Sequence, residues 1–265
     1  MKISMMSMVM DEKGFSPEEI VRTAADCRME GIDWVTEHGC SAEYLKKLCD
    51  DAGLPVVAYT PLIGNPPWSQ DEFVERFKRA LDFGVTLEAP VMMIPVCKLD
   101  CGSRDLDRAK WIEAFARVTP MAQQAGITLT FEAMGMCLAP IQSADECLEV
   151  LKAVPDMRIT FDSGNVETVE DPVVSYCKLA DQVVHVHLKD FLCASAPDSN
   201  GTWLPALNRK YYKQAAFGEG SSDLKTMCQT MKALGYQGYV NFETSSASVP
   251  MPEFLKMLCD RMRDW

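Results

Sequence analysis

The stretch VVHVHLKDF, residues 183–191, has the pattern of a buried strand and holds two of the three histidines in the chain. Its alternating side chains fall on two faces, an apolar face of Val184, Val186 and Leu188 and a polar face of His185, His187 and Lys189. Two explanations fit this stretch alone. The histidines are either a hydrogen-bonded pair in the core, or part of a strand that ends in a metal site.

Three further stretches show the same alternation and also end on a charged residue: ITLTFE (127–132), MRITFD (157–162) and GYVNFE (238–243). In each, the apolar set faces one way and the polar set faces the other. The polar rows end at Glu132, Asp162 and Glu243, in positions comparable to His187 and Lys189. Four consecutive strands are therefore expected to direct polar side chains into one enclosed space.

The whole chain repeats one unit, an apolar strand followed by an amphipathic helix. Capping boxes predict helix starts at Ser16, Ser69 and Ser143, each with a glutamate three residues later. Eight such units in about 250 residues predict a (β/α)8 TIM barrel, with residues 1–265 as a single domain. A doubly wound sheet is less favoured because no G-x-G-x-x-G follows the first strand. The expected strands are 2–9, 31–37, 55–61, 90–96, 127–132, 157–162, 183–189 and 238–243.

Composition excludes several classes of function. A formal net charge of −12 opposes binding to nucleic acid, which depends on clustered Lys and Arg. No apolar run approaches the roughly 20 residues of a membrane span, and the N-terminus lacks a signal-peptide pattern. The 11 cysteines include no C-x-x-C pair, which is typical of reduced thiols in a cytoplasmic protein.

The C-terminal mouth of such a barrel is where catalytic groups gather. Carboxylates crowded there repel one another unless a cation is present. Glu132, Asp162, His187 and Glu243 are therefore predicted to bind one divalent metal ion, with Mn²⁺, Mg²⁺ or Co²⁺ suited to the oxygen-rich set. A hydrogen-bonded polar plug is the alternative. His185 lies one layer deeper and is expected to support the site or the core.

The motifs TFE (130–132), FDSGN (161–165), HVHLKD (185–190), FGEG (217–220) and NFE (241–243) occur in an order that resembles the xylose isomerase-like TIM barrel superfamily. This sugar phosphate isomerase/epimerase group also includes inosose dehydratases and endonuclease IV-type enzymes. The resemblance implies that Glu132, Asp162, His187 and Glu243 bind one metal ion, Mn²⁺ first and Zn²⁺ also among the candidates. It further implies that Glu132 and Glu243 act as acid and base through a metal-stabilised enediolate.

The sequence departs from the superfamily pattern at two places. Many members carry a histidine three residues after the aspartate of the sixth strand, where this chain has Asn165. Ketose 3-epimerases place an arginine after the seventh strand, and this chain has none there. Lys189 with Asp190 resembles the inosose dehydratase-like and hydroxypyruvate isomerase-like branches instead. Lys189 either holds a substrate oxygen or helps as an acid, or it forms a structural ion pair with Asp190 or Glu219.

Substrate contacts are predicted at Lys189, Asn165, His185 and Glu37, the last of which ends the second strand beside His38. Residues 192–217 form a long segment whose composition, including Trp203, suits a lid, although an insertion or a subunit contact would look the same. FGEG is expected to be a tight turn before a helix, with a phosphate cradle as the less favoured interpretation.

These observations together predict a metal-dependent isomerase or epimerase of a sugar or polyol. The alternatives are an inosose dehydratase-like lyase and a barrel that has lost activity and serves as a binding subunit. An endonuclease IV-like enzyme would need more histidines than the three present. The expected partner is a small molecule, and assembly into a homo-oligomer stays open.

Overall fold

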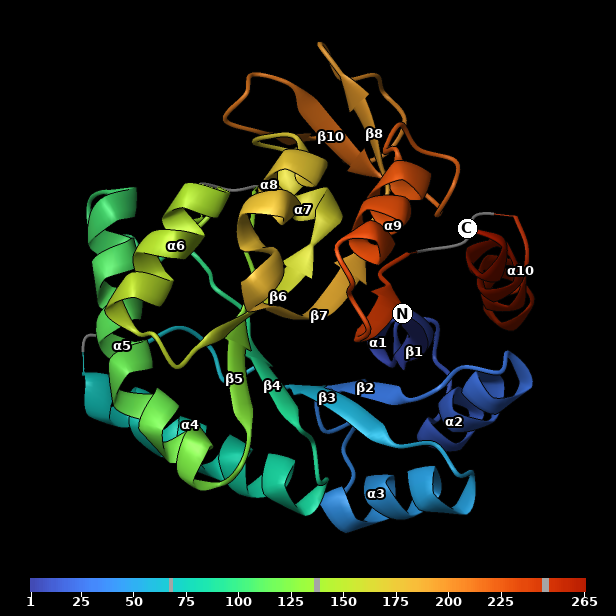
Figure 1. Cartoon of the computed structure of the whole chain (residues 1–265), viewed down its shortest axis with the longest axis horizontal. Coiled ribbons are helices and arrows are strands. Elements are labelled where there is room, and N and C mark those ends of the chain that lie inside the picture. Colours follow the sequence, from blue (N-terminus) through green and yellow to red (C-terminus); the bar gives the residue numbers. More distant parts are fainter. Residues whose placement is uncertain (67–68, 136–138, 245–247) are drawn as a thin grey trace.

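The computed structural model describes residues 1–66, 69–135, 139–244 and 248–265. Within these ranges, eight parallel strands close into a barrel in the order β1-β11-β7-β6-β5-β4-β3-β2, and helices surround it (Figure 1). The predicted (β/α)8 TIM barrel is thereby confirmed. The barrel strands are β1 (Lys2–Met6), β2 (Ile32–Val35), β3 (Val56–Thr60), β4 (Val91–Ile94), β5 (Thr128–Phe131), β6 (Arg158–Asp162), β7 (Val183–Leu188) and β11 (Tyr239–Phe242).

The helices alternate with the strands along the chain. None of those in the described ranges combines the length and apolar character needed to cross a bilayer. They are α1 (Met8–Asp11), α2 (Pro17–Asp26), α3 (Ala42–Asp51), α4 (Gln70–Thr86), α5 (Arg104–Gln124), α6 (Ala144–Ala153), α7 (Ser163–Glu167), α8 (Pro172–Leu179), the 3₁₀ helix η1 (Ala180–Gln182), α9 (Leu224–Ala233) and α10 (Met251–Asp264).

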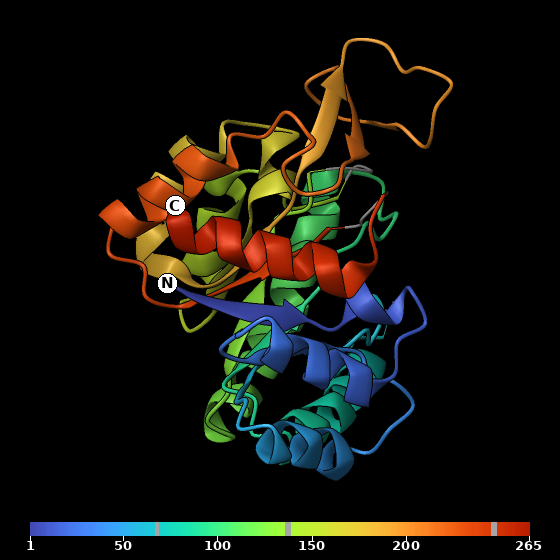
Figure 2. The same ribbon diagram turned by 90° about the vertical axis from the view of Figure 1, so that its right-hand side faces the viewer.

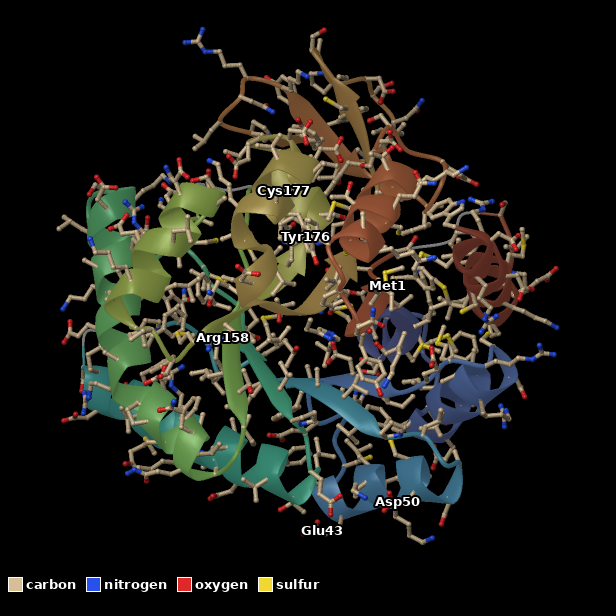
Figure 3. All side chains as sticks on the ribbon, in the orientation of Figure 1. Met1, Glu43, Asp50, Arg158, Tyr176 and Cys177 are labelled. Carbon is tan, nitrogen blue, oxygen red and sulfur yellow. The ribbon has the colours of Figure 1, made fainter. Side chains whose placement is uncertain are left out.

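The core lies between the outer face of the strands and the helices. Phe131 of β5 stacks on Phe115 of α5 with ring centroids 5.7 Å apart, as expected for an outward-facing residue. The neighbouring inward residue Thr130 meets Thr160 of β6 in the lumen, with their hydroxyl oxygens 2.8 Å apart. On the outer side of α3, Glu43 and Asp50 are exposed (Figure 3). The alternation of the strands thus separates a helix-covered core from a polar lumen.

Two of the three predicted capping boxes form. Ser16 and Ser143 each accept a hydrogen bond from the backbone of the glutamate three residues later, which reciprocates at the cap residue. Ser69 is the N-cap residue of α4, but its side chain makes no capping hydrogen bond, so the capping box predicted there is wrong.

The first strand is shorter than the predicted range 2–9. It ends at Met6, and α1 begins at Met8. The reason is Ser7, whose backbone is helical and whose side chain turns toward β2. There the Ser7 hydroxyl accepts a hydrogen bond from the Val35 amide at 2.8 Å. This contact replaces the extended continuation of the strand.

The long segment after β7 forms a small antiparallel sheet of β8 (Phe191–Ala194), β10 (Tyr211–Gln214) and β9 (Leu204–Pro205). Figures 1 and 2 show that this sheet projects from the body of the molecule. The pairing of β8 with β10 continues toward the barrel, where the Ala215 amide donates to the Asp190 carbonyl at 2.9 Å.

Candidate active site

Four ionisable side chains converge where β5, β6, β7 and β11 end. Asp162 is the last residue of β6 and lies beside His187 in the register of the two strands. Glu132 and Glu243 directly follow β5 and β11. The Nδ1 atom of His187 lies 3.4 Å from Glu132 Oε2 and 4.0 Å from Glu243 Oε2. The structure therefore brings together the four residues that the sequence predicted as metal ligands.

The donor atoms of this cluster suit a cation. One ligand atom each of Glu132, Asp162 and His187 lie within 4.8 Å of one another, and all three residues are buried. Among the described residues, Glu132 Oε2, Asp162 Oδ2 and His187 Nδ1 make no hydrogen bond, although Asp162 Oδ2 lies 3.1 Å from the Lys189 ammonium. Unpartnered buried polar atoms are uncommon and call for an ion or water. Three carboxylates and one imidazole form an oxygen-rich set of the kind that binds Mg²⁺ or Mn²⁺.

Lys189 supplies positive charge to the same cluster. Its Nζ atom lies 2.5 Å from Glu243 Oε1 and 3.1 Å from Asp162 Oδ2, and it donates to Asn165 Oδ1 at 3.3 Å. Burial alone would lower the pKa of Lys189, but the carboxylates of Asp162 and Glu243 outweigh it and raise the pKa. Lys189 is therefore a cation that lies against two of the candidate ligands.

The predicted partners of Lys189, Asp190 and Glu219, are wrong. The Asp190 carboxylate accepts the backbone amides of Gly218, Gly220 and Ser222 at 2.8, 3.0 and 3.2 Å. Glu219 is exposed. Asp190 also fills the turn formed by FGEG, because a side chain at Gly220 would collide with its carboxylate. This turn therefore offers its amides to the protein's own carboxylate, which contradicts the interpretation as a phosphate cradle.

Burial and neighbouring charges shift the pKa of two residues in the cluster. It raises the pKa of Glu243 to about 7, with Lys189 acting against this effect. Burial alone would lower the pKa of His187, but Asp33 and Glu132 outweigh it and raise the pKa to about 10. A carboxyl group that titrates near neutral pH can both accept and return a proton.

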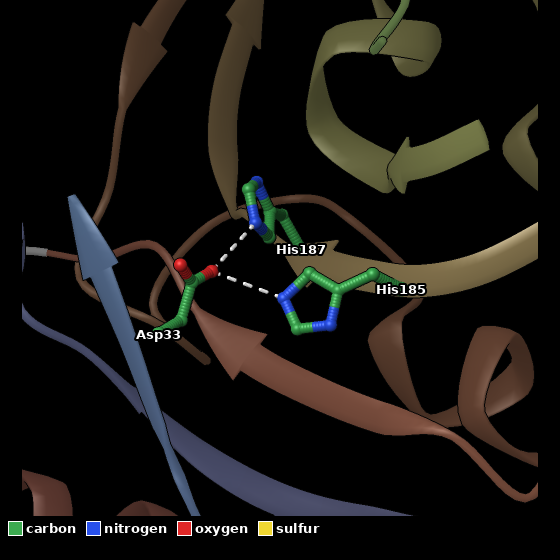
Figure 4. A group of neighbouring side chains, drawn as sticks. All are labelled: Asp33, His185 and His187. Carbon is green, nitrogen blue, oxygen red and sulfur yellow. Dashed lines mark hydrogen bonds and ion pairs between the residues drawn. The ribbon is translucent and has the colours of Figure 1, made fainter. Parts of the chain in front are cut away.

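A second layer of polar side chains lies below the cluster, deeper in the barrel. The Asp33 carboxylate on β2 accepts hydrogen bonds from His185 at 3.0 Å and from Asn241 at 2.5 Å. His185 is buried and reaches no further than this layer. Figure 4 shows the Asp33 carboxylate facing both His185 and His187. The sequence analysis missed Asp33, although it is the only charged residue in the otherwise apolar strand IDWV.

Asn165 lies in the first turn of α7 and belongs to the cluster through two contacts. The backbone N–H of Asn165 donates to Asp162 Oδ1 at 2.9 Å, and the side-chain oxygen of Asn165 accepts from the Lys189 ammonium at 3.3 Å. Since Asn165 is buried against both residues, it fixes the position of Lys189 beside the carboxylates.

Glu37 lies elsewhere on the barrel mouth, beyond the ends of β2 and β3. It lines a cavity of about 370 Å³ together with Thr36, His38, Gly39, Tyr59, Pro61, Leu62 and Ile63. Thr36 and His38 adopt left-handed backbone conformations, with φ of 68° and 50°. Such strain is unfavourable for a β-branched residue and persists only where its surroundings enforce it.

A chain of contacts enforces that conformation. His38 Nε2 lies 2.8 Å from the Ser7 hydroxyl, and His38 Nδ1 lies 3.1 Å from Asp11 Oδ1. This arrangement resembles the relay of serine hydrolases. Ser7 is fully buried and already bonded to the Val35 amide, so no substrate reaches it. The Ser7 hydroxyl thus contacts Val35 and His38, on either side of Glu37 in the chain.

The projecting sheet carries Trp203 directly before β9. The Trp203 indole donates to Asp198 at 2.9 Å, and Lys213 lies over its ring at 4.8 Å. At the inner end of the sheet, the Gln214 side chain donates to the Glu243 carbonyl at 3.3 Å. The sheet is thus hydrogen-bonded to the backbone of Glu243, one of the candidate metal ligands. Closure of residues 192–217 over the barrel mouth stays a prediction.

The family model of xylose isomerase-like TIM barrels matches residues 20–264. The chain belongs to this family. No curated protein matches the sequence. The matched region includes all four candidate ligands as well as Asp33.

Several solved structures share this fold at low sequence identity. The probable 3-DHS dehydratase AsbF of Bacillus anthracis is 15% identical, with a TM-score of 0.77 and 99% of each chain covered. The 3-keto-D-glucoside 4-epimerase YcjR of E. coli is 17% identical, with a TM-score of 0.73 and 100% of each chain covered. The IolI protein with a bound zinc atom is 13% identical, with a TM-score of 0.74, covering 100% of this chain and 94% of that one. At these identities the likeness shows the fold alone.

Proposed function

We propose that this member of the xylose isomerase-like family is a divalent-metal-dependent isomerase or epimerase of a sugar or polyol. The observation that carries the proposal is the convergence of Glu132, Asp162 and His187 within ligand distance of one another, with Glu132 Oε2 and His187 Nδ1 free of hydrogen bonds among the described residues and Glu243 Oε2 4.0 Å from the same His187 nitrogen. Two similar structures belong to a 3-keto-glucoside epimerase and a probable dehydratase, which supports an enzyme of this kind.

Glu132, Asp162, His187 and Glu243 would hold the metal ion. Mn²⁺ is the first candidate, with Mg²⁺, Co²⁺ and Zn²⁺ as the others. When bound, the ion would withdraw electron density from the substrate carbonyl and stabilise the negative charge that develops on its oxygen.

The two glutamates are suited to opposite halves of a proton transfer. β5 and β11, which carry Glu132 and Glu243, flank β6 and β7 in the barrel. One carboxylate removes the proton from the carbon next to the carbonyl, and the C–H electrons form the double bond of an enediolate. The other carboxyl group returns a proton. Return to the opposite face of the same carbon gives an epimer, and return to the former carbonyl carbon gives an isomer.

Other residues of the mouth would orient the substrate. Lys189 and Asn165 offer donors beside the carboxylates, and Glu37 lines the cavity above β2 and β3. We propose that this cavity receives the part of the substrate that does not react. His185 would contribute from the layer below without touching substrate.

The test is turnover of a panel of keto-sugars in D₂O with Mn²⁺, followed by NMR at partial conversion. Deuterium should appear on the carbon next to the carbonyl. Glu132→Gln and Glu243→Gln should each reduce turnover by roughly a hundredfold or more, because the amide cannot transfer the proton. Glu219→Gln, at an exposed position, is the matched control and should leave turnover unchanged. Full retention of the substrate hydrogen would contradict proton transfer.

Dehydration of a keto-sugar is the second candidate function. The observation that favours it is Lys189, whose ammonium lies 2.5 Å from Glu243 and would provide a hydrogen-bond donor for a departing hydroxyl. A product lighter by one water in mass spectrometry would assign this reaction. Absence of both turnover and bound metal would favour a non-catalytic barrel instead.

A further inference from the structure

The Asp33 carboxylate lies on the far side of His187 from the candidate metal ligands. Its Oδ2 atom is 3.5 Å from His187 Nε2, while His187 Nδ1 faces Glu132 Oε2 at 3.4 Å (Figure 4). Asp33 and His187 are both completely buried. The imidazole is therefore placed between a carboxylate below it and the cluster above it.

The position of the Asp33 carboxylate influences which ring nitrogen of His187 carries the proton. A histidine that binds a metal ion is neutral and carries one proton, so one ring nitrogen donates a hydrogen bond and the other offers a lone pair. A carboxylate next to Nε2 favours the tautomer with the proton on Nε2. Nδ1 then presents its lone pair to the cluster, as a metal ligand must.

Asp33 is itself held in place by residues from three other strands. His185 on β7 and Asn241 on β11 both donate to its Oδ2 atom, at 3.0 and 2.5 Å. Ser4 on β1 in turn donates to the Asn241 side-chain oxygen at 2.5 Å, which fixes the direction of the amide. All of these side chains are buried. Both hydrogen bonds to Asp33 are made to Oδ2, the oxygen that lies beside His187.

We infer that Asp33 is a positioning residue that fixes the tautomer and orientation of His187 for metal binding. The inference rests on the proposed metal centre. In the metal-loaded protein, His187 Nε2–H donates to Asp33 and the contact tightens from its present 3.5 Å. Asp33 itself touches neither metal nor substrate.

A second metal ion between Asp33, His185 and His187 is the competing explanation, because their ligand atoms also lie within 4.8 Å of one another. That arrangement would require His187 to bind two cations through both nitrogens, which a neutral imidazole cannot do. It would also require the ion to displace the Asn241 amide, which donates directly to Asp33. The positioning role needs neither change.

The experiment measures the affinity for Zn²⁺ by calorimetry in the wild type and in Asp33→Asn, which keeps the shape and removes the charge. Affinity should fall roughly 10- to 100-fold, the usual effect of removing the partner of a metal-bound histidine. Asp107→Asn is the matched control, since Asp107 is also buried but binds the backbone amides of Leu99, Asp100 and Cys101. It should leave the affinity for Zn²⁺ unchanged.

A second measurement does not depend on any variant folding. With only three histidines in the chain, ¹⁵N-histidine labelling gives a resolvable spectrum of ring nitrogens. In the Zn²⁺-loaded wild type, His187 should carry its proton on Nε2 and bind Zn²⁺ through Nδ1.

The outcomes separate this inference from the proposed function. If the wild type binds Zn²⁺ and Asp33→Asn binds it equally well, or His187 binds through Nε2, the positioning role is wrong and the metal centre stands. Two ions per chain, one of them lost in His185→Ala, would replace it with a second metal site. A wild type that binds neither Zn²⁺ nor Mn²⁺ overturns the metal centre and this inference together.

Discussion

Replacing Lys189 with methionine should destabilise the metal-free protein far more than the metal-loaded protein. The ammonium lies 2.5 Å from Glu243 and 3.1 Å from Asp162, in a region that water hardly reaches. Methionine keeps the apolar stem and removes the charge. The two carboxylates then lose their nearest fixed cation, and removing one partner of a buried ion pair costs roughly 3–5 kcal/mol.

The lower end of that range applies here, because the pKa of Glu243 is already raised to about 7 and protonation relieves part of the repulsion. About 3 kcal/mol corresponds to a fall in Tm of roughly 6 °C for a chain of this size. With saturating Mn²⁺, the bound ion compensates the same carboxylates, so the fall should be much smaller.

The assay is thermal unfolding followed by circular dichroism, in EDTA and in Mn²⁺, for the wild type, Lys189→Met and the control Lys47→Met. Lys47 forms an exposed ion pair with Asp51 and should change Tm by no more than the error of the measurement. An equal loss of Tm with and without metal would refute the reasoning, because Lys189 and the metal would then not share the same carboxylates.

Three further predictions concern other parts of the molecule. Ser143→Ala should cost about 1 kcal/mol in chemical unfolding because it removes a formed capping box, whereas Ser69→Ala should cost little because that serine makes no capping bond. Burial raises the pKa of Glu167, so its contribution to stability is present at low pH and is lost as pH rises through that raised pKa. As pH rises from acidic to neutral, the free energy of unfolding of Glu167→Gln should therefore increase relative to that of the wild type. Urea titrations that give the same difference between the two proteins at every pH would count against this. If residues 192–217 close over the mouth, saturating substrate should change tryptophan fluorescence in the wild type and not in Trp203→Phe; an unchanged wild-type signal would exclude closure.

The sequence predicts the barrel and the four converging residues because both depend on local pattern. The alternation of apolar and polar residues decides which way each strand faces, and the strand ends then locate Glu132, Asp162 and Glu243. Because neighbouring strands are parallel, their ends lie together whatever conformation the loops adopt. The family resemblance assigns the same residues, so two independent arguments agree.

The contacts that the sequence could not predict join residues far apart in the chain. Asp33 meets His185 across 152 positions, and only the curvature of the closed barrel places β2 near β7 in this way. Adjacency in the sequence, by contrast, led to the wrong prediction that Lys189 pairs with Asp190. Lys189 and Asp190 are neighbours in sequence, but consecutive residues of an extended chain point to opposite sides. Lys189 therefore enters the lumen, while Asp190 turns away to bind the amides of the following turn.

The distribution of charge in the lumen connects the two layers of the site. Asp33, Glu132, Asp162 and Glu243 supply four carboxylates, and Lys189 and His187 are the cationic partners that the structure places against them. Since burial opposes an unbalanced charge, this surplus of carboxylates either takes up protons or attracts a further cation. Lys189 lies against Glu243 and Asp162, whereas Asp33 lies against His187 on the opposite side. Glu132 Oε2 and His187 Nδ1, which make no hydrogen bond among the described residues, face each other at 3.4 Å beside Asp162, and a divalent ion bound there would restore the balance.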